Sequence, residues 1–195
     1  MAILEPDVIS ALNRQVPKVS RRDLEREARK KFKKIKQEMI NEFLANPVTQ
    51  EIMSGSQGAN ISGTLGGVSN LFAFIGFNQG DDPIAPILVM LEGVTLNYES
   101  DIKRSLKGFG INFKANLPIP EDIFAITPLP WATGRSWAEG IERGLSGLGH
   151  LLRKNKGRSG AAIQTSVKVR GGGFQNVPYI SALLRKYRKR FQDLK

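Results

Sequence analysis

The clearest alternation of apolar and polar positions lies in the last third of the chain and predicts a helix within Thr127–Lys154. Ser136 is a favourable N-cap, and Glu139, three residues later, completes a capping box. Apolar residues then recur at helical spacing and form one stripe: Trp137, Ile141, Leu145, Leu148 and Leu152. We expect this segment to be the central helix of the fold.

A second stripe of the same helix consists of glycine. Gly140, Gly144 and Gly147 follow one another at spacings of four and three residues. Each interior glycine weakens a helix by about 1 kcal/mol relative to alanine. Three on one face indicate that another backbone passes close by, since only a missing side chain permits that approach. The three glycines are therefore candidate residues of a subunit or partner interface.

The first third predicts a long amphipathic helix. Ser20 with Asp23 forms a capping box at its start, and Pro47 closes it. Between them runs one apolar stripe: Leu24, Ala28, Phe32, Ile35, Met39 and Phe43. Such a helix is a rod of about 37 Å at 1.5 Å per residue. Residues 1–19 show no clear period, and we expect an arm that ends in a short helical turn.

This long helix also carries a run of basic residues: Arg29, Lys30, Lys31, Lys33, Lys34 and Lys36. A helix of this length in a chain of 195 residues extends past its own core. It is a candidate for contact with a neighbouring subunit, and Arg29, Lys30, Lys33 and Lys34 are the residues that we expect at that interface.

Residues 54–70, SGSQGANISGTLGGVSN, contain few side chains that could build a core. They predict a long flexible loop that is either functional or ordered only on assembly. The segment matches neither the GxxxxGK[ST] nor the GxGxxG phosphate-binding pattern. We therefore predict no nucleotide site there.

The middle of the chain predicts an antiparallel sheet with a short helix. Asp82 as a cap and Pro83 in the first turn start an apolar helix that Gly93 ends. The apolar run LFAFIGF at 71–77 indicates a strand, and alternating patterns elsewhere indicate further strands. These are 94–98, 111–117, a hairpin partner at 123–127, and 163–170.

The last element is an amphipathic helix from Pro178 to about Leu194. Its apolar face is formed by Ile180, Leu184, Tyr187, Phe191 and Leu194. The opposite face is expected to carry Arg185, Lys186, Arg188, Lys189 and Arg190, all candidate interface residues.

Together these elements predict an α+β fold: an antiparallel sheet packed by the central helix and the C-terminal helix, with a long N-terminal amphipathic helix. We divide the chain into an N-terminal arm and long helix, 1–46, and an α+β core, 47–195. A chain of 195 residues can bury a core without disulfides or metals.

The net charge of +11 is unevenly distributed. Residues 1–46 have a net charge of +4, residues 47–130 of −4 and residues 131–195 of +11. An acidic middle between basic ends suits nucleic acid, an acidic protein surface, or a second copy packed head to tail. Solvated helix faces explain any single cluster equally well.

We find no set of residues that predicts catalysis. There is no cysteine and a single histidine, His150, so neither a thiolate nor a transition-metal site is expected. The adjacent carboxylates Asp81–Asp82 and Glu121–Asp122 point in different directions on any regular element and form no acid/base pair. No signal peptide or membrane-spanning segment is predicted. We expect a protein that is not an enzyme, uses no cofactor and assembles in the cytoplasm.

The order of elements resembles the neck and tail-completion (head–tail connector) proteins of tailed bacteriophages. The resemblance rests on the basic helix Arg21–Leu44, on ISGTLGGVSNLFAFIGF, and on GRSWAEGIERGLSGLGHLL followed by SGAAIQTSVKVRGG. It implies a structural virion protein that forms a ring of identical subunits, six by analogy, at the neck or tail end. Its neighbours would be a portal-side adaptor and tail tube or sheath proteins, with no membrane.

The same resemblance implies that double-stranded DNA passes through the lumen, which the acidic middle third could line while the basic ends face neighbours. The alternative is a basic nucleic-acid-binding protein, ribosome- or nucleoid-associated, that uses the C-terminal helix. A small hydrolase is disfavoured because no catalytic constellation is present.

Overall fold

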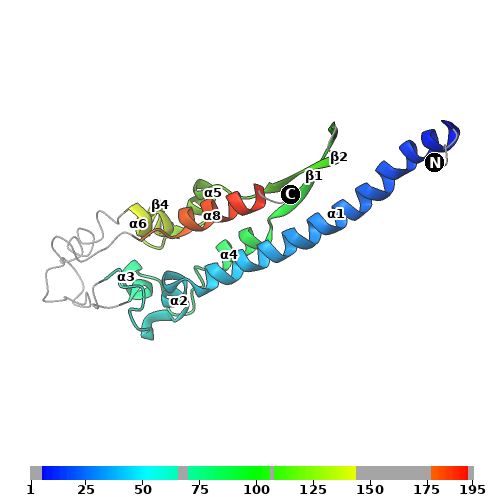
Figure 1. Cartoon of the computed structure of the whole chain (residues 1–195). Helices are drawn as coiled ribbons and strands as arrows, with labels where there is room; N and C mark the ends of the chain where they lie inside the picture. Colours follow the sequence, from blue (N-terminus) through cyan, green and yellow to red (C-terminus); the bar gives the residue numbers. More distant parts are fainter. Residues whose placement is uncertain (1–5, 66–69, 106–107, 144–176, 193–195) are drawn as a thin grey trace, which may run out of the picture.

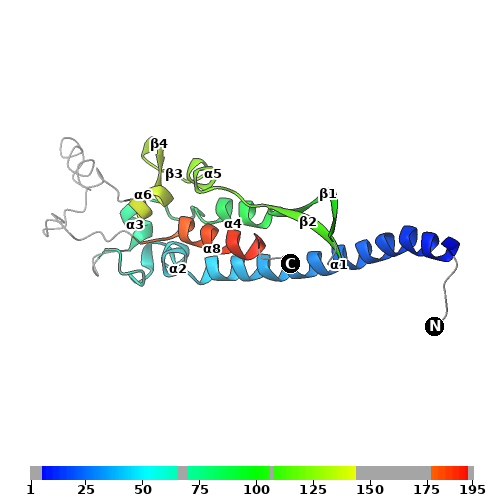
Figure 2. The same ribbon diagram turned by 45° about the horizontal axis from the view of Figure 1, so that its top comes forward.

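The computed structural model describes residues 6–65, 70–105, 108–143 and 177–192, with side chains described from residue 21 onward, those of 99–111 excepted. A long helix, α1, runs along a body of shorter helices and two small antiparallel two-stranded sheets (Figures 1 and 2). The α+β prediction is confirmed, including the long N-terminal helix, which contacts the C-terminal helix.

Helix α1 spans Pro6–Ala45, 40 residues in one element. The prediction of an irregular arm at residues 1–19 was wrong for the part described. Proline suits the first turn of a helix, where its missing N–H has no partner to lose, and Pro6 stands there. The helix continues through Pro17. Its C-terminal half buries Met39 and Phe43 on the predicted stripe, and its N-terminal end extends beyond the other elements (Figure 1).

Two short helices follow: α2, Pro47–Met53, and, after the 3₁₀ turn η1, Gly55–Gln57, the helix α3, Leu71–Ile75. The strand predicted at 71–77 was therefore wrong. The side chain of Asn70 caps α3 by accepting from the Ala73 N–H at 2.9 Å, and Gly76 ends it with a φ of +90°. A short apolar run fits a buried helical turn as well as a buried strand, and here the caps decide.

The loop between α2 and α3 is attached to the core by polar side chains. The buried carboxylate of Glu51 accepts hydrogen bonds from the backbone N–H groups of Ser62 at 2.8 Å and Leu71 at 2.7 Å. The Asn70 amide donates to the carbonyls of Gly55, Ser56 and Gly58. These contacts fix both ends of the segment 54–70, of which residues 66–69 lie outside the described chain; its mobility stays a prediction.

Helix α4, Ala85–Glu92, begins two residues after the predicted start. The carboxylate of Asp82 accepts from the N–H groups of Ile84 at 3.2 Å and Ala85 at 3.0 Å, and Gly93 closes the helix as predicted. Pro86 is the second residue of the helix. Its missing N–H costs nothing there, because an N–H in the first turn has no acceptor inside the helix.

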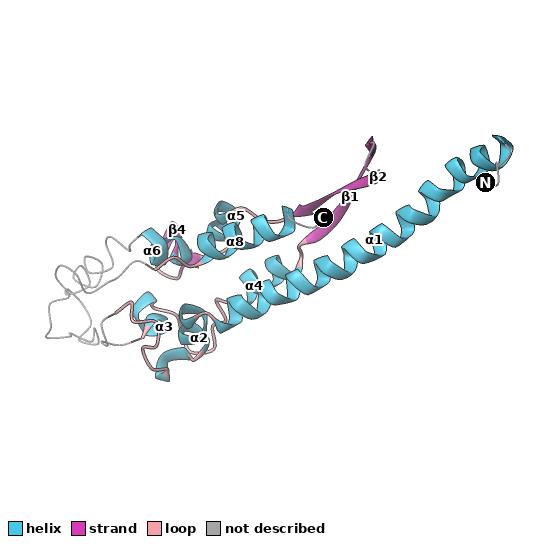
Figure 3. Ribbon diagram, in the orientation of Figure 1, coloured by secondary structure: helices cyan, strands magenta, loops and turns pink. Residues whose placement is uncertain are grey.

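The larger sheet is a hairpin of β1, Thr95–Ser105, and β2, Gly108–Asn116 (Figure 3). The strands predicted at 94–98 and 111–117 are present and longer than predicted. Thr95 pairs with Asn116 and Tyr98 with Phe113, and the register shifts between Tyr98 and Ile102. The guanidinium of Arg21 lies 4.2 Å from the centre of the Tyr98 ring, so the hairpin crosses α1 at this point.

Residues 120–136 form α5, Pro120–Ala125, and a small hairpin of β3, Pro128–Leu129, with β4, Ala132–Ser136. The strand predicted at 123–127 was wrong. Pro120 occupies the first turn of a helix, and the Asp122 carboxylate accepts from the Ile119 N–H at 3.0 Å. These capping groups start a helix where the apolar alternation alone indicated a strand.

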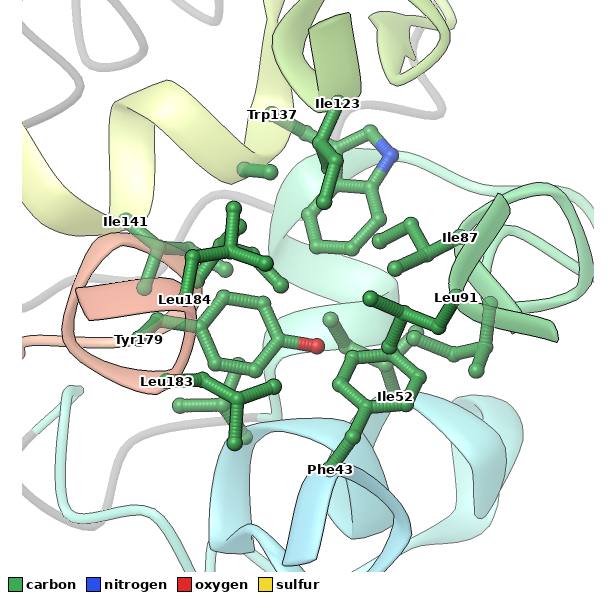
Figure 4. Packing of buried hydrophobic residues seen from close by; sticks show 14 of the residues in the cluster. Phe43, Ile52, Ile87, Leu91, Ile123, Trp137, Ile141, Tyr179, Leu183 and Leu184 are labelled. Carbon is green, nitrogen blue, oxygen red and sulfur yellow. The ribbon is translucent and has the colours of Figure 1, made fainter. Parts of the chain in front are cut away.

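Helices α6, Trp137–Arg143, and α8, Ile180–Gln192, complete the body. Trp137 and Tyr179 lie among the side chains of α1, α2, α4 and α8 (Figure 4). The Tyr179 hydroxyl is 2.8 Å from the Thr49 hydroxyl, and burial raises the pKa of this tyrosine. The strand predicted at 163–170 and the central helix beyond Arg143 lie outside the described residues.

Candidate assembly interface

Helix α8 lies antiparallel on the C-terminal half of α1, and its apolar face is buried as predicted at Ile180, Leu184, Tyr187 and Phe191. The Phe191 ring centre lies 5.3 Å from that of Phe32. Leu194 lies outside the described residues. The two helices thus pack through their apolar faces. The charged residues of α8 beside this contact are the candidate interface residues.

Two basic residues of α8 are neutralised within the subunit. Lys186 forms an ion pair with Glu42 at 2.6 Å, and Arg190 forms one with Glu38 at 2.5 Å. The prediction that all five basic residues occupy the face opposite the apolar stripe was wrong for these two. Residues 186 and 190 follow one another at helical spacing along the edge of the stripe, where they reach α1.

The pairing perturbs the groups that form it. The hydrogen bond from Lys186 holds the pKa of the Glu42 carboxyl below its ordinary value, although partial burial opposes this. Burial, together with the hydrogen bond that the Tyr187 hydroxyl donates to Glu42 at 2.7 Å, raises the pKa of Tyr187 to about 12. The hydrogen bond to Glu38 raises the pKa of Arg190. Both shifts favour the charged forms of Glu42 and Arg190, which stabilise the contact between α1 and α8.

The other three basic residues of α8 point to solvent. Arg185, Arg188 and Lys189 are exposed, and within the described part of the chain none of them has an acidic partner. They remain available to a partner molecule. Their excess positive charge on one exposed helix face is the feature that the sequence predicted.

On α1 the predicted interface residues are exposed. Arg29 pairs with Glu25 at 2.8 Å, an exposed pair of the same helix that stabilises it by a few tenths of a kcal/mol. Lys30, Lys33 and Lys34 have no ion-pair partner among the residues that the structure describes. They form, with Arg22, an outer basic face of α1 on the side away from the core.

Lys36, which the sequence groups with this basic run, has a different role. Its ammonium donates to the carbonyl of Val94 at 3.1 Å and to that of Glu92. These carbonyls lie at and just after the C-terminal end of α4, where backbone acceptors lack helical partners and the helix dipole favours a cation. Lys36 thus attaches α4 to α1.

The glycine face can be located only in part. Gly140 is buried in α6, next to buried Ile141, and the α6 N-cap is the predicted one, with Ser136 Oγ accepting from the Glu139 N–H at 3.1 Å. Gly144, Gly147 and His150 lie outside the described residues. The close backbone approach predicted over the three glycines remains a prediction.

Sequence reasoning missed an apolar surface on α4. Seven of the eight residues of this helix, APILVMLE, are apolar. Ile87 and Leu91 are buried, whereas Val89 is 67% exposed and Pro86 is exposed beside it. A helix that is apolar all round is normally covered on all sides. The sequence APILVMLE already shows that the helix has no polar face. This indicates that its exposed side is a candidate surface for contact with another molecule.

A second pattern was missed in the N-terminal half of α1. Positions 8, 12, 16 and 19 are Val, Leu, Val and Val, at the i, i+4, i+8, i+11 spacing of one helix face. The backbone at these four positions is helical, so they share one side of α1.

The described residues offer little for chemistry. One open pocket of about 340 Å³ lies between α2, α3 and the turn before α4, lined among others by Met53, Phe72 and Asp81. Within the described ranges, no group of three or more His, Cys, Asp or Glu side chains could hold a metal ion. In the same ranges no helix combines the length and apolar character that crossing a membrane requires.

Comparison with known proteins finds no match: no family model fits the chain, and no curated protein or solved structure is significantly similar to it.

Proposed function

We propose that this chain is a structural subunit that assembles with copies of itself into a closed ring, and that the ring joins head and tail in the neck or at the tail end of a tailed phage. The observation that carries the proposal is α1. This helix of 40 residues buries Ala28, Met39 and Phe43 against its own core, and its N-terminal end extends past the rest of the subunit (Figures 1 and 2). Such an element supports contact with another molecule.

Charge and apolar surface support the same proposal. The outer face of α1 is basic, the exposed face of α8 is basic, and the middle of the chain has a net charge of −4. A subunit with basic helix faces and an acidic middle segment suits a heterologous, head-to-tail contact between copies. Such contacts close into a ring when the rotation that relates neighbouring subunits permits it. The resemblance of Arg21–Leu44 and of ISGTLGGVSNLFAFIGF to phage neck proteins supports a position of this ring in the neck or at the tail end of the virion.

In this function the subunit performs no chemistry. The ring would contact a portal-side adaptor on one side and tail tube or sheath proteins on the other, with double-stranded DNA passing through its lumen. The exposed Arg185, Arg188 and Lys189 would then meet acidic protein surfaces of these neighbours. Such charges at an interface rim chiefly set orientation and association rate.

Electron microscopy of the purified chain tests the proposal. Class averages should show rings of uniform size with a central opening, and six-fold symmetry is the expectation from the resemblance. Open filaments or isolated subunits in place of rings would contradict it. A defective-particle assay adds the virion context: phage that lack the chain should accumulate full heads and separate tails.

The second candidate, a nucleic-acid-binding protein, is favoured by the exposed cations Arg185, Arg188 and Lys189, which have no acidic partner among the described residues. It predicts tight binding whose logarithm falls with the logarithm of salt concentration at a slope of about −0.9 per phosphate contacted. Changing the three residues to Gln should abolish that binding. Under the first proposal the parent binds free DNA weakly, and the same changes impair docking to a neighbouring virion protein instead.

A further inference from the structure

We propose that the open pocket between α2, α3 and the turn before α4 receives two lysine side chains of a second copy, Lys30 and Lys34 of its α1. This inference rests on the proposed function and names the two surfaces that meet in the ring contact. The side chains of both surfaces are described, and within the described part of the subunit neither surface has a partner of opposite charge.

One part of the pocket lining is apolar. The pocket encloses about 340 Å³, and Ile52, Met53 and Phe72 are among its lining residues. Ile52 and Phe72 belong to the core, whereas Met53 is 59% exposed. Apolar side chains can cover the methylene stem of a lysine while its ammonium reaches a polar group.

Another part of the lining is acidic. The Asp81 carboxylate accepts from the Asn78 N–H at 2.7 Å, and one oxygen of Asp82 accepts from the N–H groups of Ile84 and Ala85. The second oxygen of each carboxylate has no hydrogen bond to the rest of the described chain. Two carboxylates that are held in direction and keep a free oxygen suit the ammonium groups of a partner.

The subunit itself holds the walls of this pocket. The Asn70 amide donates to the carbonyls of Gly55 at 3.2 Å and Ser56 at 2.9 Å, and both residues line the pocket. Asp82 is fixed to the first turn of α4. A site that is formed in advance loses little conformational freedom on binding, so the contacts made there keep more of their strength.

The second surface is the outer face of α1 around Lys30 and Lys34. Both side chains are exposed, and neither has an ion-pair partner among the residues whose side chains are described. Residues four apart are neighbours on a helix surface, with Cβ atoms about 5–6 Å apart. The two ammonium groups can therefore reach two adjacent carboxylates, Asp81 and Asp82, in one pocket.

The partner is a second copy because the two surfaces lie apart in one subunit. Residues 34 to 45 cover about 16 Å of α1, and Met53 on α2 comes after the end of that helix. Figure 1 shows α2 and α3 at this end, whereas α1 extends in the other direction past its own subunit. A lysine side chain is too short to span this distance. The contact thus joins two different faces of two copies and is head to tail.

The nature of the contact makes it sensitive to salt. Exposed ion pairs are individually weak, and salt screens them. The apolar lining and the repetition of the contact around a ring add to the charge pairing. We expect assembly at low ionic strength and its progressive loss as salt is added.

Substitution of Gln79 tests the pocket without disturbing the fold. Gln79 lines the pocket, is exposed, and makes no side-chain hydrogen bond to the described residues. Gln79→Glu adds a negative charge and should lower the concentration of half assembly, whereas Gln79→Lys should raise it. The expected shift is about fivefold in each direction, the upper range for one exposed charge pair. Sedimentation velocity at low salt measures this concentration.

A coupling experiment tests the pairing with α1. A chain with Lys30→Gln and Lys34→Gln should assemble more weakly than the parent, and in it the effect of Gln79→Glu should shrink, since the cations that the new charge attracts are absent. Lys114→Gln is the matched control. Lys114 is exposed on β2, and its substitution should leave the effect of Gln79→Glu unchanged.

Carbodiimide coupling gives a second readout that does not depend on loss of assembly. The reagent joins a lysine amine to a carboxyl that it contacts, and takes up the water released as the amide bond forms. Applied to mixed isotope-labelled and unlabelled parent chains, it should link Lys30 or Lys34 of one copy to Asp81 or Asp82 of another. Mass spectrometry of the linked peptides reads the mixed label.

The outcomes separate this inference from the proposed function. If the parent assembles while the two Gln79 substitutions leave assembly unchanged, or shift it in the same direction, the pocket is not the contact. The inference is then overturned while the ring proposal stands. A link from Asp81 or Asp82 to a lysine of the same copy, or to lysines other than Lys30 and Lys34, also overturns the inference. A parent chain that never assembles overturns both.

Discussion

The ammonium of Lys36 lies 3.1 Å from the carbonyl oxygen of Val94, so one side chain of α1 holds the end of α4. The two residues are 58 positions apart in the sequence. Their contact fixes the C-terminal end of α4 against α1 and thereby joins the middle of the chain to the long helix.

Replacing Lys36 by Met should destabilise the subunit by about 1–3 kcal/mol, because the hydrogen bonds donated by a charged group are lost while the apolar stem is kept. The change is measured by urea unfolding at a protein concentration low enough for the chain to be monomeric. Lys33→Met is the control: Lys33 is exposed and has no ion-pair partner among the described residues, so its effect should stay within about 0.5 kcal/mol. Equal effects of the two substitutions would contradict the role of Lys36.

Glu51→Gln should destabilise the subunit by about 1–3 kcal/mol. The buried carboxylate accepts from the N–H groups of both Ser62 and Leu71, and an amide directs its own donor at one of them. Amide exchange of Ser62 and Leu71 should be slow in the parent and fast in the variant. Glu27→Gln, an exposed change on α1, serves as the control. Fast exchange of both amides in the parent would show that the loop is not held by Glu51 and that the whole segment 54–70 is mobile.

The pairing of Glu42 makes stability depend on pH in the acid range. The pKa of Glu42 in the folded subunit is lowered below the ordinary value of 4.5, chiefly by the hydrogen bond from Lys186. A group with a lowered folded pKa contributes stability above its unfolded pKa, and this contribution is lost as the pH falls through the folded value. Comparing parent and Glu42→Gln, the difference in unfolding free energy should be present at pH 6 and vanish on acidification. A difference that is constant with pH would contradict the pairing.

Tyr187 gives the corresponding effect in alkali. Its folded pKa of about 12 exceeds the ordinary value of 10.0, because the hydroxyl is partly buried and donates to Glu42. The contribution of the Tyr187 hydroxyl to the free energy of unfolding is complete below pH 10 and is lost as the pH rises toward 12. Tyr187→Phe should remove this alkaline loss of stability relative to the parent. Absorbance titration of the phenol checks the pKa directly, and a value near 10 in the folded chain would contradict it.

Substitution at Gly140 tests the glycine stripe of the central helix within the described residues. Gly140 is buried, so Gly140→Leu should overpack its surroundings and destabilise the subunit by about 1–3 kcal/mol. An exposed glycine would give the opposite sign, since leucine is the better helix former by most of 1 kcal/mol. A melting temperature at or above that of the parent would therefore reject a close approach at this position. The same sign is predicted for Gly144→Leu, where assembly is the additional readout.

Sequence patterns predicted the elements whose periodicity is strong and uniform. The stripe Ile180, Leu184, Tyr187 and Phe191 correctly predicts α8, because an amphipathic helix on a core must repeat at this spacing. Ser136 correctly marks the start of α6 because its hydroxyl accepts from the Glu139 N–H of the first turn. These predictions rest on local physics alone.

The errors arise where tertiary structure or capping overrides a short pattern. LFAFIGF is equally apolar as a strand or a helix, and the side chain of Asn70 with the left-handed Gly76 makes it α3. The first part of α1 was missed because residues 1–19 contain Pro6 and Pro17, and a proline inside an apolar stretch normally predicts the end of a helix. The division of the α8 cations into paired and exposed groups depends on Glu38 and Glu42, which are far away in the sequence.

The central claim is that the chain functions as an assembly of identical subunits. The most direct test is the mass of the purified parent chain in solution over a concentration series. The account predicts one dominant species that is a whole multiple of the 21.5 kDa chain and that does not grow further with concentration, as a closed ring requires. A mass that stays at 21.5 kDa at the highest concentration reached would contradict it.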